Sequence, residues 1–264
     1  MESSKNDRYF LKSLANGIRV LEIVAESDCP VTLSEIATKL DTTKTTATRI
    51  CYTLTELKFL HKNENNKYCL TPKNLKFGYG SLKTMGWRGI AKTYLEKLFS
   101  DVQETIALTI LDGTDVLFLM RMRQGNFFPF NAGVGTKLPA HCASTGKAML
   151  AFLPQNKRQS ILDRMSFKPL TVHSIKSAGD FTAELAVIRE KGFAANYEEV
   201  SIGVCGISAP ILDVKGEPIA GISISSDTTK YTKSALEEKL GPIVVNTAKQ
   251  ISEALIHIDV PEIY

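Results

Sequence analysis

Three amphipathic segments, separated only by short polar breaks, fill residues 13–60 and constrain this end of the chain more than any other feature. Within residues 13–27, apolar side chains recur every three or four positions, which is the spacing of one helix face, and Ser13 is a suitable N-cap. That face consists of Leu14, Ile18, Leu21 and Val24. This end of the chain is therefore expected to be a small domain built from short helices.

The second and third segments have the same character. Residues 31–40 predict a helix that begins at Thr32 or Ser34. Its inward positions are Leu33, Ile36, Ala37 and Leu40. After the break at residues 41–43, a third helix is predicted over residues 43–60, with Ile50, Leu54 and Leu57 on its buried side. A break of about three residues before the last helix is typical of a helix-turn-helix.

A short hairpin is expected directly after the third helix. Residues 59–71 contain two β-prone runs on either side of Asn63–Asn66, and asparagine tolerates the positive φ that tight turns need. A hairpin in this place forms the wing of a winged helix-turn-helix. Lys62 and Lys67 flank its turn, where they either contact backbone phosphate or remain idle surface charges.

The start of the third helix carries the residues expected to read DNA. Hydroxyl and cationic side chains can hydrogen-bond phosphate there and reach base edges in the major groove. The candidates are Thr43, Lys44, Thr45, Thr46, Thr48 and Arg49. Alternatively, the threonines merely cap their own helix. The whole arrangement of helix, helix, break, helix and hairpin favours DNA. The charge distribution fits this, because residues 31–77 hold eight Lys and Arg against four Asp and Glu, whereas residues 78–264 hold twenty against nineteen.

The remainder of the chain alternates strand and helix patterns, which predicts an α+β domain with a mostly antiparallel sheet. Helices are expected over residues 88–101, 143–152, 155–165, 180–191 and 232–257, and strands on both sides of Asp112-Gly113 and over residues 193–197, 204–212 and 218–225. The domains expected are a winged helix-turn-helix (1–73), a linker helix containing glycines 78, 80 and 86 (74–86) and a larger domain (87–264).

Several function classes find no support in the sequence. The five cysteines include no CxxC pair, and the four histidines lack the spacing of metal ligands. Neither a nucleophile elbow nor a phosphate-binding glycine loop occurs, so we expect no enzyme, no cofactor and no metal. No apolar run is long enough for a membrane helix and the first ten residues are polar, so we expect a cytoplasmic protein.

Four ordered blocks of this sequence resemble the IclR family of bacterial transcription regulators. They begin with the helix-turn-helix segment and continue with VGTKLPAHCASTGKAMLAFLP (134–154), ELAVIREKGFAANYEEVSIGVCGISAP and GEPIAGISIS. The VGTKLPAHC stretch is most similar to regulators of aromatic-acid breakdown that answer to hydroxybenzoate-type compounds. The resemblance implies a linker helix, a GAF/profilin-like effector domain, homodimers or dimers of dimers, and palindromic operators. Repression, activation and contact with RNA polymerase all stay open.

The resemblance also implies an effector pocket. Matching blocks assign it Ser144, Thr145, Asn196, Gly206, Ser223 and Ser225. The residues support this independently, because 144–146 open a helix whose free N–H groups favour a carboxylate, and Ser223 and Ser225 share one face of a strand. His141 is either part of the pocket wall or structural. Arg121 and Arg123 either point into the pocket or lie on the outer face.

These residues predict the chemistry of the effector. An arginine inside the pocket would pair with a carboxylate. Gly206, where relatives that bind small oxo-acids carry a cysteine, leaves room for a ring. We therefore expect an aromatic carboxylate. The alternative is a ligand-sensing, protein-interaction module that does not act on DNA.

Overall fold

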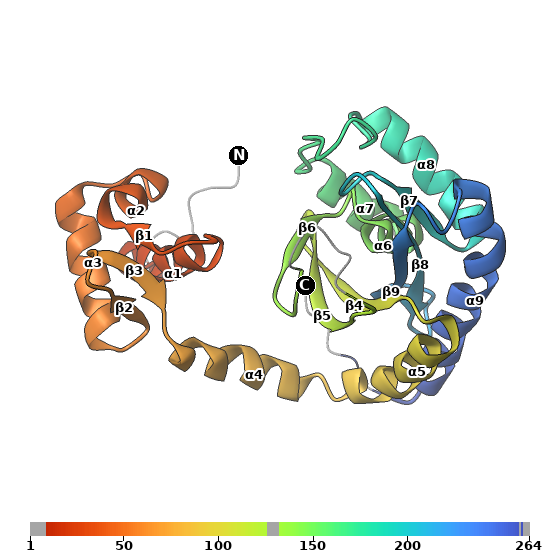
Figure 1. Ribbon diagram of the computed structural model, residues 1–264, viewed down its shortest axis with the longest axis horizontal. Coiled ribbons are helices and arrows are strands. Elements are labelled where there is room, and N and C mark those ends of the chain that lie inside the picture. The colour runs from red at the N-terminus through yellow and green to blue at the C-terminus, as the bar shows by residue number, and fades with distance from the viewer. Residues whose placement is uncertain (1–8, 126–131, 259, 261–264) are drawn as a thin grey trace. The chain divides into compact units, whose positions relative to one another are not determined.

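The computed structural model describes residues 9–125, 132–258 and 260 (Figure 1). Most of the polar opening stretch, on which the expectation of no export signal rests, lies outside these residues. The chain divides into two compact units, residues 1–83 and 84–264. No helix of the described ranges is long and apolar enough to cross a membrane.

The first unit is a winged helix-turn-helix. Its elements are α1 (Lys12–Ala25), β1 (Val31–Thr32), α2 (Leu33–Lys39), α3 (Lys44–Glu56), β2 (Leu60–Lys62), β3 (Lys67–Leu70), a 3-10 turn (Pro72–Asn74) and α4 (Leu75–Thr84). The predicted helices and the hairpin are confirmed, and Asn66 adopts the positive φ expected of the turn. Strand β1, which was not predicted from the sequence, pairs antiparallel with β3 and makes the sheet three-stranded.

Local capping explains where α2 begins. The Thr32 hydroxyl accepts the Glu35 amide, and the Glu35 carboxylate accepts the Thr32 amide in return at 2.7 Å. Ile36 and Ala37 then point into the core, as predicted. The capping box fixes α2 immediately before the turn that leads into α3.

Three details of the predicted helices are wrong. Helix α1 has Leu11 as its N-cap rather than Ser13, and its core face is formed by Val20, Ile23 and Val24. Leu14 and Ile18 are 60% and 52% exposed, so the apolar pattern of α1 has two parts, of which the core covers one. Leu57 is also half exposed, because α3 ends at Glu56 and Lys58 turns the chain with a positive φ.

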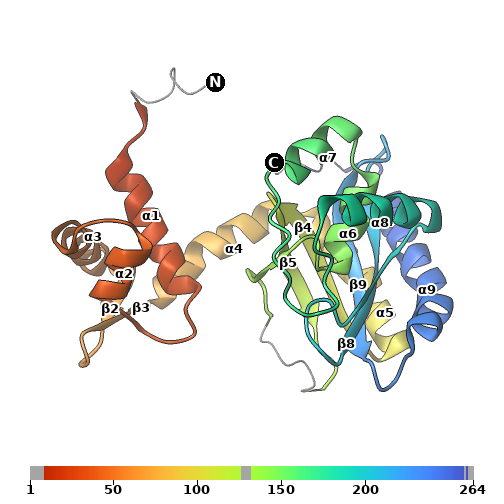
Figure 2. The ribbon, with the colours of Figure 1, turned by 90° about the horizontal axis from the view of Figure 1, so that it is seen from above.

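The second unit is a six-stranded antiparallel sheet between two helix layers (Figure 2). Its helices are α5 (Trp87–Val102), α6 (Ser144–Phe152), α7 (Gln155–Leu162), α8 (Ala178–Lys191) and α9 (Lys233–Ala254). Its strands are β4 (Thr105–Asp112), β5 (Asp115–Met122), β6 (Lys137–Pro139), β7 (Ala194–Tyr197), β8 (Val204–Leu212) and β9 (Pro218–Asp227), in the order β6-β5-β4-β9-β8-β7. Helix α6, backed by α8, covers one face, and α5 and α9 cover the other.

Close backbone packing holds α6 where it is. A Cβ at Gly146 would lie 2.4 Å from the carbonyl oxygen of Ala140, so only glycine allows the chain before α6 to pass this close. Gly221 on β9 admits Thr145 of the helix in a similar way, with 3.2 Å from its ideal Cβ to the Thr145 Cβ. The beginning of α6 is thereby pressed against the middle of the sheet.

Candidate DNA interface and effector pocket

Thr43 caps the proposed recognition helix α3. Its hydroxyl accepts the Thr46 amide at 3.2 Å and lies 3.0 Å from the Thr46 hydroxyl. The Thr48 hydroxyl donates to the Lys44 carbonyl at 2.8 Å, inside the same helix. The threonine run therefore does cap and brace its own helix, which leaves DNA contact as an additional use of the same side chains.

The candidate DNA residues lie largely on the surface. Thr43, Lys44, Thr45, Thr48 and Arg49 are exposed, and Thr46 is half-buried. Lys62 and Lys67 are exposed on the two strands of the wing. Tyr52, also on α3, is 65% exposed although it is a large aromatic residue. We did not single out Tyr52 from the sequence, but its distance of seven from Thr45 places it on the same helix face.

The end of α3 is tied to the beginning of α4. The Lys73 ammonium donates to the Leu57 carbonyl at 2.7 Å and lies 4.4 Å from the centre of the Phe59 ring. The Asn74 amide donates to the Phe59 carbonyl at 2.8 Å. Phe77 of α4 packs on the Phe59 ring, with 5.6 Å between the ring centres. These polar and apolar contacts hold the first turn of α4 against the residues that follow α3. We call this region the joint between α3 and α4.

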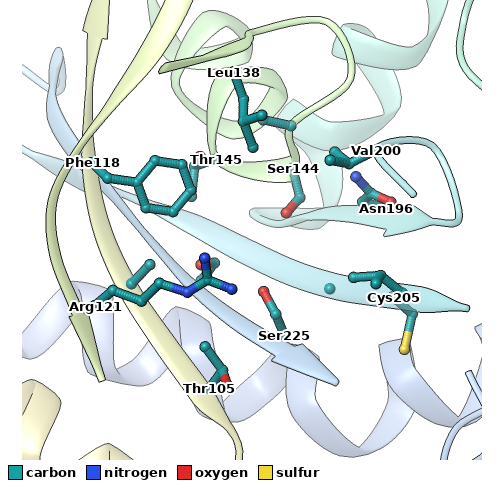
Figure 3. A pocket seen from close by; sticks show the side chains of 15 residues that line it. Thr105, Phe118, Arg121, Leu138, Ser144, Thr145, Asn196, Val200, Cys205 and Ser225 are labelled. Carbon is teal, nitrogen blue, oxygen red and sulfur yellow. The ribbon is translucent and has the colours of Figure 1, made fainter. Parts of the chain in front are cut away.

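A small cavity lies between α6 and the sheet of the second unit (Figure 3). Its volume is about 50 Å³. The lining includes seven residues predicted for the effector pocket: Arg121, Ser144, Thr145, Asn196, Gly206, Ser223 and Ser225. Residues that we did not predict complete it: Thr105, Ala107, Phe118, Leu138, Ala143, Val200, Val204 and Cys205.

Strand register explains how distant residues meet in this cavity. Ser225 pairs with Thr105 on one side and Gly206 on the other, and Gly206 pairs with Asn196. These positions form one row across four strands. Two residues further along, Ser223 lies in the next row on the same face, as its alternation with Ser225 predicted.

Arg121 is the cation of the cavity. Its guanidinium points between the strands toward Ser225 in Figure 3, and it donates to the Ala132 carbonyl at 2.7 Å. Burial lowers the pKa of Arg121 to about 10, so the side chain is still charged at neutral pH. Arg121 thus points into the cavity and does not lie on the outer face of the sheet. Arg123 is exposed.

Two of the predicted polar groups are already engaged inside the protein. The Ser144 hydroxyl lies 2.7 Å from that of Ser208. The Asn196 amide donates to the Cys142 carbonyl at 2.6 Å, and its oxygen accepts the Glu199 amide at 3.1 Å. Asn196 thus borders the cavity mainly as a brace. The amides of residues 144–146 precede the first intrahelical bond of α6, from Lys147 to the Ala143 carbonyl.

Of the two alternatives for His141 the structure has the structural one, whereas Gly206 differs from what we expected of it. His141 is not part of the lining; its Nε2 lies 3.3 Å from the Lys168 carbonyl and its ring meets the Phe167 ring edge-on. Burial lowers the pKa of His141 below its ordinary value. At Gly206, an added Cβ would be 3.2 Å from the Ser225 hydroxyl, so the space beside this glycine is filled by a neighbouring strand.

A larger hollow of about 650 Å³ lies elsewhere in the second unit, beside α7 and the residues that follow α9. None of the residues predicted for effector binding is among its described lining residues. The small cavity, where a cation and several hydroxyls converge, is therefore the better candidate site. The described residues also contain no group of three or more His, Cys, Asp or Glu that could hold a metal ion.

Known proteins share this architecture. Two family models match, the IclR helix-turn-helix domain over residues 13–64 and the bacterial transcriptional regulator IclR C-terminal domain over residues 79–253. The acetate operon repressor of Salmonella typhimurium is 28% identical, over 92% of this chain and 90% of its own length. The crystal structure of a putative transcriptional regulator from Rhodococcus sp. RHA1 is 30% identical, with a TM-score of 0.76 over 93% of this chain and 98% of the other.

A third relative was solved with a ligand. It is the inducer binding domain of a double mutant of the PobR transcription factor from Acinetobacter, in complex with 3-hydroxybenzoic acid. It is 27% identical, with a TM-score of 0.57, and covers 62% of this chain and 96% of that domain.

A winged helix-turn-helix joined to a sheet domain with a polar cavity under one helix defines a DNA-binding transcription regulator. The two matched segments extend over most of the sequence, in the same order as the two units. The chain belongs to the IclR family. Proteins of this family are transcription regulators rather than enzymes, and the DNA-binding domain removes the alternative of a module that does not act on DNA.

Proposed function

We propose that this chain binds a palindromic operator as a homodimer or a dimer of dimers, and that an aromatic carboxylate in the small cavity controls this binding. The DNA contacts are made by the start of α3 and by Lys62 and Lys67 of the wing. The single observation that carries the effector class is the pairing of Arg121 with Phe118 inside one cavity, because together they offer a cation and a ring face.

The names of relatives do not decide the effector class by themselves. The acetate operon repressor and the 3-hydroxybenzoic acid complex are almost equally similar to this chain, at 28% and 27% identity. The lining supports an aromatic acid, since Phe118, Leu138 and Val200 give the cavity apolar walls opposite its polar groups. Thr145, Ser223 and Ser225 supply hydroxyls that a ring-bound hydroxyl group can meet.

Size gives the effector a means of changing the protein. A dry cavity that accepts benzene has a volume of about 150 Å³. This volume is three times that of the cavity described here, which is about 50 Å³. An aromatic acid must therefore separate the walls, and it stabilises the widened state by its preference for that state. We propose that this change reaches the DNA-binding unit through the linker around Gly78, Gly80 and Gly86.

Large apolar side chains that are exposed on the first unit support self-association. They lie along α1 with the residues before it and along α4: Tyr9, Phe10, Leu11, Leu14, Ile18, Leu75, Phe77 and Tyr79. A monomer rarely exposes so many large apolar side chains in one small domain. Dimerisation through such side chains would also match two half-sites of a palindrome. We also propose that the protein acts in the cytoplasm and that it can contact RNA polymerase.

The test is a mobility-shift titration on the DNA that flanks this gene, with and without hydroxybenzoates. A discrete complex whose affinity changes with one acid supports both parts of the proposal. Steep weakening with added salt identifies phosphate contacts. A complex that ignores every aromatic acid but responds to a small aliphatic acid contradicts the effector class and leaves DNA binding intact.

A further inference from the structure

A buried ion pair lies beside the cavity without lining it. Lys147, in the first turns of α6, has no exposed surface. Its Nζ lies 2.7 Å from Glu199 Oε1 and 3.5 Å from Glu184 Oε1. Glu199 is also buried, and its second oxygen has no hydrogen-bond partner among the described residues. A buried ion pair of this kind contributes little net stability to the fold. We therefore expect it to hold the segments that it joins in position.

The pair closes a ring of polar contacts. The Glu199 amide donates to Asn196, and Asn196 donates to the Cys142 carbonyl, two residues before α6 begins. Lys147 of α6 then returns to the Glu199 carboxylate. The ring therefore joins both ends of the first helical turn of α6 to the connection between β7 and β8, residues 198–203.

This ring borders a part of the wall that lies outside the helices and strands. Val200 follows Glu199 and lines the cavity beside Asn196 and Ser144, as Figure 3 shows. Most of the remaining wall belongs to strands β4, β5, β8 and β9, which are hydrogen-bonded to neighbours on both sides, or to α6, which is buried along most of its length. The connection 198–203 has no regular secondary structure of its own.

On the basis of the proposed effector function, we infer that Lys147 and Glu199 are positioning residues that hold Val200 close to the start of α6 and thereby limit the size of the effector. We expect a ligand that enlarges the cavity to push residues 198–203 away from α6, which stretches the ring. A charge-assisted hydrogen bond at 2.7 Å fixes a distance more strictly than apolar packing does. The pair thus favours one-ring acids over two-ring acids.

The positioning role is tested first without any effector. In the full-length Glu199→Gln variant, amide hydrogen exchange of residues 198–203 should become at least tenfold faster, while amides in β8 and β9 keep their rates. Glu217→Gln is the matched control, because it removes an ion pair of the same 2.7 Å length, Lys157–Glu217, on the surface. Unchanged exchange at residues 198–203 in Glu199→Gln overturns the inference.

Ligand size is tested next, by calorimetric titration of benzoate and 2-naphthoate. In Glu199→Gln the ratio of their Kd values should shift at least tenfold toward naphthoate; an equal loss for both acids marks a merely structural pair and overturns the size-limiting role. If the unmodified protein binds neither acid, the size-limiting role fails, and the exchange experiment still decides the positioning role; the hydroxybenzoate titration tests the proposed effector class separately.

A variant that fails to fold does not end the test. Lys147→Met/Glu199→Leu replaces the buried pair with apolar side chains of similar size, an exchange that proteins often tolerate. We expect the same faster exchange at residues 198–203 from this double variant, and slow exchange there contradicts the inference.

Discussion

Phe118 and Arg121 lie three residues apart on β5 and nevertheless face the same cavity, with 5.8 Å between the guanidinium carbon and the ring centre. In a regular strand, residues an odd number apart point to opposite faces. Here Thr109 of β4 pairs with Phe118 and Leu108 pairs with Met120, so Leu119 is the extra residue of a β-bulge. The bulge turns both side chains inward.

Arg121→Met should weaken the binding of an aromatic acid at least about tenfold, because a hydrogen bond between two charged groups contributes roughly 1.5–3 kcal/mol. Calorimetric titration with a hydroxybenzoate measures this. Arg123→Met is the matched control, since Arg123 is exposed two residues further on. Equal affinities in Arg121→Met and the unmodified protein would remove Arg121 from the binding site.

Gly146→Ala should destabilise the second unit by at least about 2 kcal/mol, because the new Cβ meets the Ala140 backbone and neither segment has room to retreat. Trp87 is the only tryptophan and is buried in this unit, so its fluorescence follows unfolding in urea. Gly89→Ala in α5, where a Cβ meets nothing within 4 Å, should be stabilising by about 0.5–1 kcal/mol. Similar effects at both glycines would refute the steric argument.

Thr43→Ala should cost the first unit about 1 kcal/mol through the loss of a helix cap. Thr43→Asn should restore stability, because asparagine caps equally well, and yet leave DNA affinity reduced if the threonine also contacts DNA. Thermal unfolding by circular dichroism and mobility shifts separate the two effects. Full DNA affinity in Thr43→Asn would restrict Thr43 to capping.

His141 should make the second unit less stable in mild acid. Its folded-state pKa lies below the ordinary 6.5, so the unfolded chain takes up a proton first. The stability that neutral His141 contributes above pH 6.5 is therefore lost as the pH falls through the folded-state value. His141→Gln should show a smaller loss of urea resistance between pH 7.5 and pH 5.5, with the exposed His257→Gln as control. A loss of equal size in His141→Gln would contradict this assignment.

Gly78→Ala/Gly80→Ala should keep DNA binding and reduce the response to effector. Both glycines lie within α4, and a Cβ at either position meets nothing within 4 Å. Replacing glycine by alanine stabilises the helical state by roughly 0.5–1 kcal/mol per position, so the helix bends or unwinds less readily. The measurement is the ratio of operator affinities with and without effector, beside Gly89→Ala as control. An undiminished ratio would place the conformational change outside α4.

The fold was largely predictable because its signals are local. Gly192 ends α8 with a positive φ, and the Asp112-Gly113 turn joins β4 to β5 as expected. Strands β1 and β6 were missed because they have only two and three residues and are defined by their partners. The core face of α1 was misjudged because one apolar pattern serves two surfaces, of which the folded chain covers one.

The cavity was predictable in its polar part only. The family resemblance assigned Ser144, Thr145, Ser223 and Ser225 to it, and strand alternation and the start of a helix supported that assignment. Phe118 was hidden by the bulge, since strict alternation with Arg121 places it on the wrong face. The fit of Gly206 against Ser225 depends on register between β8 and β9, which no short stretch of sequence encodes.

The joint between α3 and α4 has a consequence for the construction of chimaeric biosensors. Lys73, Asn74 and Phe77 belong to the DNA-reading half as much as the wing does, because they clamp the end of α3. A graft that exchanges sensing halves between relatives should therefore be spliced beyond Phe77. A splice directly after the wing, at Leu70, would remove the native contacts of Lys73, Asn74 and Phe77 from the DNA-binding domain. Such a chimaera should lose DNA recognition instead of only changing its ligand specificity.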